Sequence, residues 1–146
     1  MRRVITSLGC VTALALVATL AVRATPSAPI VPIVVAKVSY TGLESQIGTT
    51  TLYTPKSDGD YQVVVYATAS SAPGGNSQLT VTTSWTDDSL SESTPLYCGP
   101  GGTGIPWASS ITAIHAKGGA PIQFSAAYSA GTSGLTYDLY LTVIRD

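Results

Sequence analysis

Apolar and polar residues alternate along several short segments, and this period of two constrains the fold more than any other feature of the chain. A strand places successive side chains on opposite faces, so such a segment has one buried and one wet face. Between Asp60 and Thr68 the two sets are Tyr61, Val63, Val65 and Ala67 on one face, and Gln62, Val64, Tyr66 and Thr68 on the other. This pattern is typical of antiparallel sheets that cover a core.

Three further segments alternate in the same way: QLTVTTSW, PIQFSAAYSA and LTYDLYLTVIRD. Their predicted core residues are Leu79, Val81, Thr83, Trp85, Ile122, Phe124, Ala126, Tyr128, Leu135, Tyr137, Leu139, Leu141 and Val143. The runs IVVAKVSY, TTLYT, TPLYC and SSITAIHA raise the count to about eight strands. No segment after residue 24 has a helical period.

This organisation predicts an all-β protein, an antiparallel two-sheet sandwich of about eight strands with jelly-roll or Greek-key topology. An immunoglobulin-like sandwich is the alternative, but its paired cysteines are missing. Two glycine-containing segments, Ser57–Asp60 and Lys117–Ala120, are expected to be hairpin turns with glycine at positive φ. The longest irregular segment, residues 98–110, surrounds Trp107 and is a candidate functional loop.

The amino terminus has the layout of a secretory signal peptide. Arg2 and Arg3 precede a 15-residue apolar stretch, Leu8 to Val22, and small residues precede a cleavage site after Ala24. The stretch is shorter than the ~20 residues of a membrane-spanning helix, the alternative interpretation. We therefore expect a signal peptide at 1–24, a proline-rich linker at 25–32 and a sandwich domain at 33–146. The protein would be secreted to the extracellular space, the cell surface or the periplasm.

Cleavage after Ala24 would remove three arginines and leave four basic against eight acidic residues, a net charge of −4. Nucleic-acid binding requires a basic surface that displaces counterions, so this charge excludes it. We expect no membrane span after cleavage. Cleavage would also remove Cys10 and leave Cys98 as the single cysteine of the mature chain. Cys98 would then be either a buried thiol or a partner in an intermolecular disulfide.

Three stretches, IGTTTLYTPKSDGDYQVVVYATA, SWTDD and TYDLYLTVIRD, resemble small uncharacterised β-sandwich proteins of phage structural gene clusters and environmental bacteria. The order of strands and turns, with AKGGAPIQFSAAY, also resembles the jelly roll of C1q- and tumour-necrosis-factor-like trimers. The resemblance implies a structural sandwich that assembles or binds, often as a trimer. It carries over no catalytic residue, and the leader departs from the phage group.

The sequence offers few residues for catalysis. His115 is the single histidine, which excludes zinc sites built on two or three histidines. A Ser-His-Asp triad through His115 is formally open, but no nucleophile-elbow motif accompanies it. We therefore expect no enzymatic activity.

Acidic residues near turns are candidate ligands for calcium, the one cofactor that the sequence suggests. Asp58 and Asp60 flank Gly59, and Asp87 and Asp88 follow Trp85. Neither pair has EF-hand spacing, and calcium takes 6–8 oxygen ligands. Adjacent aspartates at a strand end also point apart, so a glycosidase pair is not formed by them alone. The alternative is that each pair belongs to a solvated turn.

Four aromatic residues are candidate ligand contacts: Trp85, Trp107, Tyr66 and Tyr140. Tyr66 and Tyr140 fall on the face opposite the main apolar stripe of their segments, so we expect them to form an exposed platform. The favoured function is a secreted, non-enzymatic structural or adhesive sandwich that forms a homo-oligomer, such as a trimer, or binds a glycan or cell-surface partner. The alternative is a carbohydrate-binding or calcium-assisted ligand-binding module. A hydrolase has the least support.

Overall fold

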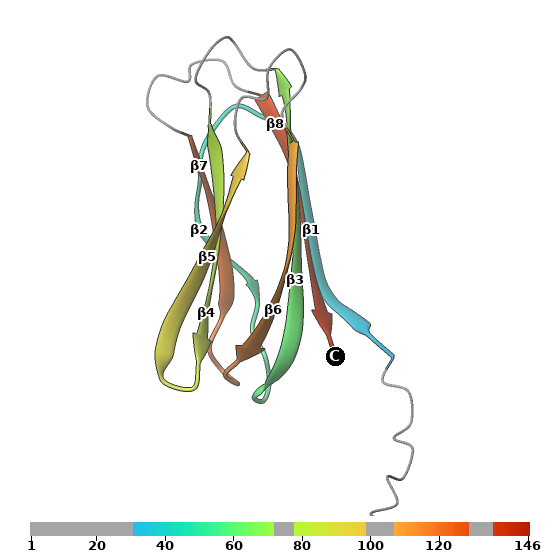
Figure 1. The fold of residues 1–146 in the computed structure, drawn as a ribbon, viewed down its shortest axis with the longest axis vertical. Helices are drawn as coiled ribbons and strands as arrows, with labels where there is room; N and C mark the ends of the chain where they lie inside the picture. Colours follow the sequence, from blue (N-terminus) through green and yellow to red (C-terminus); the bar gives the residue numbers. More distant parts are fainter. Residues whose placement is uncertain (1–30, 72–77, 99–106, 129–135) are drawn as a thin grey trace, which may run out of the picture.

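The computed structural model describes residues 31–71, 78–98, 107–128 and 136–146, apart from the side chains of residues 70, 71, 107 and 128. These ranges contain eight strands and no helix (Figure 1). The strands are β1 (Ile33–Leu43), β2 (Ile47–Tyr53), β3 (Gly59–Ser71), β4 (Leu79–Asp87), β5 (Leu90–Cys98), β6 (Trp107–Ala116), β7 (Ile122–Tyr128) and β8 (Thr136–Arg145).

The strands form two four-stranded sheets that face each other (Figure 1). Sheet A has the order β1-β8-β3-β6, sheet B has the order β2-β7-β4-β5, and every neighbouring pair is antiparallel. The chain passes repeatedly from one sheet to the other, and β4–β5 is the one consecutive pair of described strands that are hydrogen-bonded neighbours. This order is that of a jelly roll, which confirms the predicted fold class.

The core between the sheets consists of the residues that the alternation places inside. Buried positions in the predicted segments are Tyr61, Val63, Val65, Ala67, Leu79, Val81, Thr83, Ile122, Phe124, Ala126, Tyr137, Leu139, Leu141 and Val143. Leu135 and the side chain of Tyr128 lie outside the described parts. Cys98 is 2 % exposed, and burial raises the pKa of its thiol. This burial agrees with the interpretation of Cys98 as a core thiol.

The expectation of two hairpins was wrong. The β2–β3 and β6–β7 connections both pass from one sheet to the other, because β2 pairs with β7 while β3 pairs with β6 and β8. Gly119 has the expected positive φ, 81°, whereas Gly59 does not. A glycine-rich turn shows that the chain changes direction, but it does not show which sheet the next strand joins.

The β2–β3 and β6–β7 connections are joined by hydrogen bonds. The backbone N–H of Gly118 donates to Oδ1 of Asp58 at 2.8 Å, and the N–H of Gly119 donates to the carbonyl oxygen of Pro55 at 2.8 Å. Pro55 itself is buried. One end of the sandwich is therefore closed by hydrogen bonds between segments 60 residues apart in the chain.

The expected signal peptide and most of the linker lie outside the described residues, so both remain predictions. Most of the loop at 98–110 lies outside them as well. Within the described ranges, no helix has the length and apolar character needed to cross a membrane.

Candidate functional site

The outer face of sheet A is an exposed surface that carries four large apolar side chains. The strand registers set its residues in rows across the sheet, because directly paired residues share a face. These rows contain Val34, Ile144, Gln62 and Ala113; Lys37, Thr142, Val64 and Ile111; and Ser39, Tyr140, Tyr66 and Ser109. Four of the large apolar side chains are exposed: Val34 (59 %), Ile111 (69 %), Tyr66 (40 %) and Tyr140 (37 %).

Tyr66 and Tyr140 form an aromatic pair on this face. They are direct partners in the β3–β8 ladder, with ring centroids 6.0 Å apart and ring planes tilted by 42°. Tilted aromatic pairs at such distances are attractive beyond the area they bury. The structure thus confirms that the two rings lie together on the outer face, and what they contact stays a prediction.

A histidine–aspartate pair lies at one end of the same face. His115 and Asp60 are direct partners in the β3–β6 ladder, and Nδ1 of His115 lies 2.8 Å from Oδ1 of Asp60. A carboxylate can only accept, so Nδ1 carries the proton in this hydrogen bond. The hydrogen bond to Asp60 has the largest effect and raises the pKa of His115. Desolvation lowers this pKa, and the negative charges of Asp60, Asp87 and Asp88 raise it, so the net shift is upward.

The β4–β5 turn brings Asp87 and Asp88 to this pair. The backbone N–H of Lys117 donates to the carbonyl oxygen of Thr86 at 2.9 Å, which holds the turn beside the end of β6. Asp88 adopts a left-handed φ of 48°, a conformation that aspartate tolerates in turns. As a result, donor atoms of Asp87, Asp88 and His115 lie within 4.8 Å of one another.

These three side chains could hold a divalent metal ion. With Nδ1–H donating to Asp60, the imidazole has Nε2 for coordination, the arrangement by which second carboxylates orient metal-binding histidines. An imidazole ligand suits zinc and similar transition metals, whereas calcium prefers oxygen ligands alone. The sequence interpretation named both aspartates but missed His115, whose distance in the chain from Asp87 and Asp88 hides the cluster. Its expectation that the two adjacent aspartates point apart was wrong, because the left-handed φ of Asp88 turns the chain between them.

The histidine–aspartate pair predicts a pH dependence of stability. The pKa of His115 is raised above its ordinary 6.5 in the folded protein, so folding favours the charged imidazole. The stabilisation is complete below pH 6.5 and is lost as the pH rises through the raised value. We expect the melting temperature of the wild type, relative to that of His115→Gln, to fall as the pH rises across this range. A difference that is constant or that grows with pH would contradict this linkage.

The other two candidate calcium ligands, Asp58 and Asp60, stay a prediction. Asp58 binds the backbone of Gly118, whereas Asp60 binds His115, so the two carboxylates have separate structural partners. Both nevertheless lie in or beside turns, as the alternative interpretation expected. The structure places Trp107 at the start of β6, but its side chain is outside what is described.

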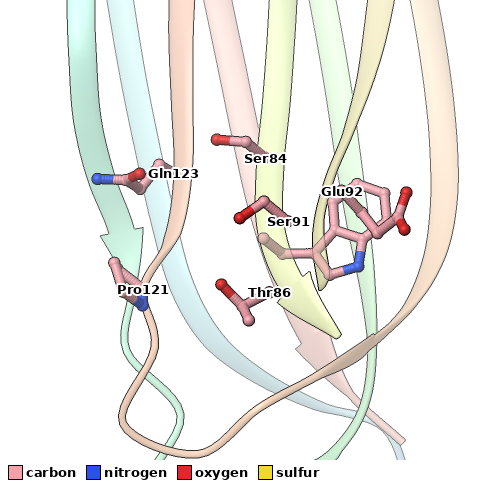
Figure 2. A pocket seen from close by; sticks show the side chains of 7 residues that line it. Ser84, Thr86, Ser91, Glu92, Pro121 and Gln123 are labelled. Carbon is pink, nitrogen blue, oxygen red and sulfur yellow. The ribbon is translucent and has the colours of Figure 1, made fainter. Parts of the chain in front are cut away.

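A small hollow lies at the end of sheet B (Figure 2). It measures about 210 Å³ and is lined by Ser84, Trp85, Thr86, Ser91, Glu92, Pro121 and Gln123. Figure 2 shows the hydroxyl groups of Ser84, Thr86 and Ser91 on the side of the hollow that faces Gln123. The hollow is smaller than the ~300–1,000 Å³ of most drug-sized ligand sites.

Trp85 is less available than a stacking platform requires. It is half-buried and packs against the core cluster, as its place on the core-facing side of β4 predicts. A sugar ring stacks on an open aromatic face, so Trp85 can offer only part of its indole to a ligand in the hollow. Tyr66 and Tyr140 are the more accessible aromatic surface.

Comparisons with known proteins add little to this description of the site. No protein-family model matches the chain, and no curated protein matches it. One solved structure with a similar arrangement is that of Eiger TNF from S. frugiperda, with 12 % sequence identity, a TM-score of 0.39, and coverage of 76 % of this chain and 92 % of that one. The likeness is slight, and the jelly-roll assignment rests on the strand order of this chain.

Proposed function

We propose that the protein is a secreted, non-enzymatic structural or adhesive β-sandwich that self-associates, or binds a surface partner, through sheet A. The observation that carries this proposal is the exposed apolar face formed by Val34, Ile111, Tyr66 and Tyr140. Contiguous apolar surface on a soluble domain commonly marks a site of interaction.

The distribution of charge on this face favours contact with a second protein surface. In the three rows that hold these side chains, Lys37 is the one charged residue. Asp60, His115 and Asp146 lie beyond the last row, where Gln62 also donates to the Asp146 carboxylate at 3.1 Å. Each face therefore brings one charged side chain, Lys37, which lies on the edge strand β1, and a lysine there can keep its ammonium group in water while its stem packs against apolar surface.

The test is capture of the purified exported protein by an immobilised copy of itself. We expect concentration-dependent capture that is weakened by the double variant Tyr66→Ser, Tyr140→Ser, because it removes the aromatic surface of the face. Tyr97→Ser is the matched control, since Tyr97 is 57 % exposed on β5 of the other sheet. No capture at any concentration would contradict self-association, and equal capture by the double variant would contradict the role of this face.

The alternative, a ligand-binding module, is favoured by the polar hollow and the neighbouring His115–Asp87–Asp88 cluster. A glycan array, together with zinc and calcium titrations followed by thermal melting, discriminates between the two functions. Binding of a glycan, lost in Trp85→Ala, would favour the ligand module. A rise in melting temperature with zinc, absent in His115→Gln, would identify the cluster as a metal site.

A further inference from the structure

Each sheet of the sandwich ends in two edge strands: β1 and β6 in sheet A, β2 and β5 in sheet B. An edge strand presents a row of backbone N–H and C=O groups that its own sheet does not pair. Proteins that stay monomeric protect such edges with irregular register, charged residues, proline or short strands. The four edges of this protein differ in that protection.

Three of the edges carry protecting features. The pairing of β1 has register shifts at Val34/Ala36 and Tyr40/Leu43, and β1 also contains Lys37. The pairing of β2 has register shifts at Ile47/Thr50 and Thr51/Tyr53. Strand β5 contains the exposed residues Glu92 and Pro95, and proline cannot donate to an added strand.

The edge of β6 lacks these features. All ten of its residues pair with β3, from Trp107 to Ala116, with no register shift. Its sequence, WASSITAIHA, contains no proline and no Asp, Glu, Lys or Arg. Ile111, near its middle, is 69 % exposed, the highest exposure among the large apolar strand side chains that the structure describes. Figure 1 shows β6 running beside β3.

We infer that β6 pairs antiparallel with β6 of a second copy about a twofold axis, joining two A sheets into one sheet of eight strands. This inference rests on the proposed self-association and names its first contact. An antiparallel edge is complementary to its own twofold copy, because each donor meets the equivalent acceptor. A second copy of the chain therefore supplies a matching strand without the need for any other protein.

A register centred on Ile111 fits the side chains. The two Ile111 side chains then become cross-strand neighbours, flanked by Val64 of each copy, which is the partner of Ile111 in β3. The contact thus covers the most exposed apolar residue of the edge. His115, four residues away, keeps its own pairing with Asp60. A twofold contact closes at two chains, so the first assembly is a dimer whose joined outer faces form one wider apolar surface.

The variant Ile111→Lys tests the contact, because it places two charges opposite each other at the axis. We expect its dimer dissociation constant to rise about tenfold or more, the effect of about 1.4 kcal/mol. Leu90→Lys is the matched control, since Leu90 is 65 % exposed at the edge strand of sheet B. The masses of both variants and the wild type are measured by light scattering, with circular dichroism as a check of folding.

The variant Ile111→Cys gives a second readout, which does not depend on weakening the dimer. Ile111→Cys is expected to form a covalent dimer under mild oxidation, whereas Leu90→Cys is not. Dimers in the wild type that persist in Ile111→Lys, with no cross-link in Ile111→Cys, would overturn the β6 contact and leave self-association standing. A wild type that is monomeric at every concentration would overturn both.

Discussion

Tyr137→Ala is expected to lower the free energy of unfolding by about 3–5 kcal/mol, the usual effect of truncating a buried aromatic residue. Tyr137 is fully buried in the core, and its hydroxyl donates to the carbonyl oxygen of Ser45 at 2.8 Å. It therefore ties β8 to the connection between β1 and β2, 92 residues earlier in the chain. Urea denaturation of the purified protein measures the change.

The variant Tyr137→Phe separates packing from hydrogen bonding in this prediction. Phenylalanine keeps the ring and removes the hydroxyl, so we expect a loss of about 0.5–1.5 kcal/mol. The Ser45 residue is exposed, and water can replace the lost donor. Equal losses in the two variants would show that the ring contributes no packing energy, which would contradict the described core.

Gly118→Ala is expected to destabilise the protein by about 1–3 kcal/mol, the range for side chains forced into filled space. A Cβ atom at residue 118 would lie 2.6 Å from Cα and 2.8 Å from the carbonyl carbon of Ser57. Both contacts are to backbone, which cannot rotate away. The substitution must therefore separate the two connections that the Asp58–Gly118 hydrogen bond joins.

Gly48→Ala is the matched control for this substitution. A Cβ atom at residue 48, in β2, would have no neighbour within 4 Å, and the backbone has no positive φ there. We expect no loss of stability, and a gain of up to about 0.4–1 kcal/mol from the reduced entropy of the unfolded chain. Denaturant titrations of both variants give the comparison. A Gly118→Ala protein as stable as Gly48→Ala would show that the connections are not in close contact.

The alternation of residues predicted most of the core because the assignment of alternate side chains to the two faces of a strand is a local property. In the Asp60–Thr68 segment, each residue assigned to the inner face is buried, and Tyr66 on the other face is exposed. The pairing of strands depends on the whole chain, and here the turn residues led to a wrong prediction of which strands pair. Asp58–Gly59 was expected to close a hairpin, but the strands on either side of it belong to different sheets.

The same division holds for the candidate site: the face on which a residue lies was predictable, but its cross-strand partner was not. The shared face of Tyr66 and Tyr140 followed from the alternation of two strands, although their direct contact required the β3–β8 register. The Asp60–His115 pair joins residues 55 positions apart, and no local pattern indicates it. The edge position of β6 is likewise a property of sheet order, which the sequence of a single strand does not give.

The central claim is that sheet A joins copies of this protein, with β6 as the first contact. Sedimentation equilibrium of the purified exported protein tests it most directly. We expect a two-chain species as the first associated form, which dissociates to one chain on dilution and forms less readily in Ile111→Lys. A mass of one chain at every concentration would contradict self-association, and a first associated form of three chains would contradict the twofold contact.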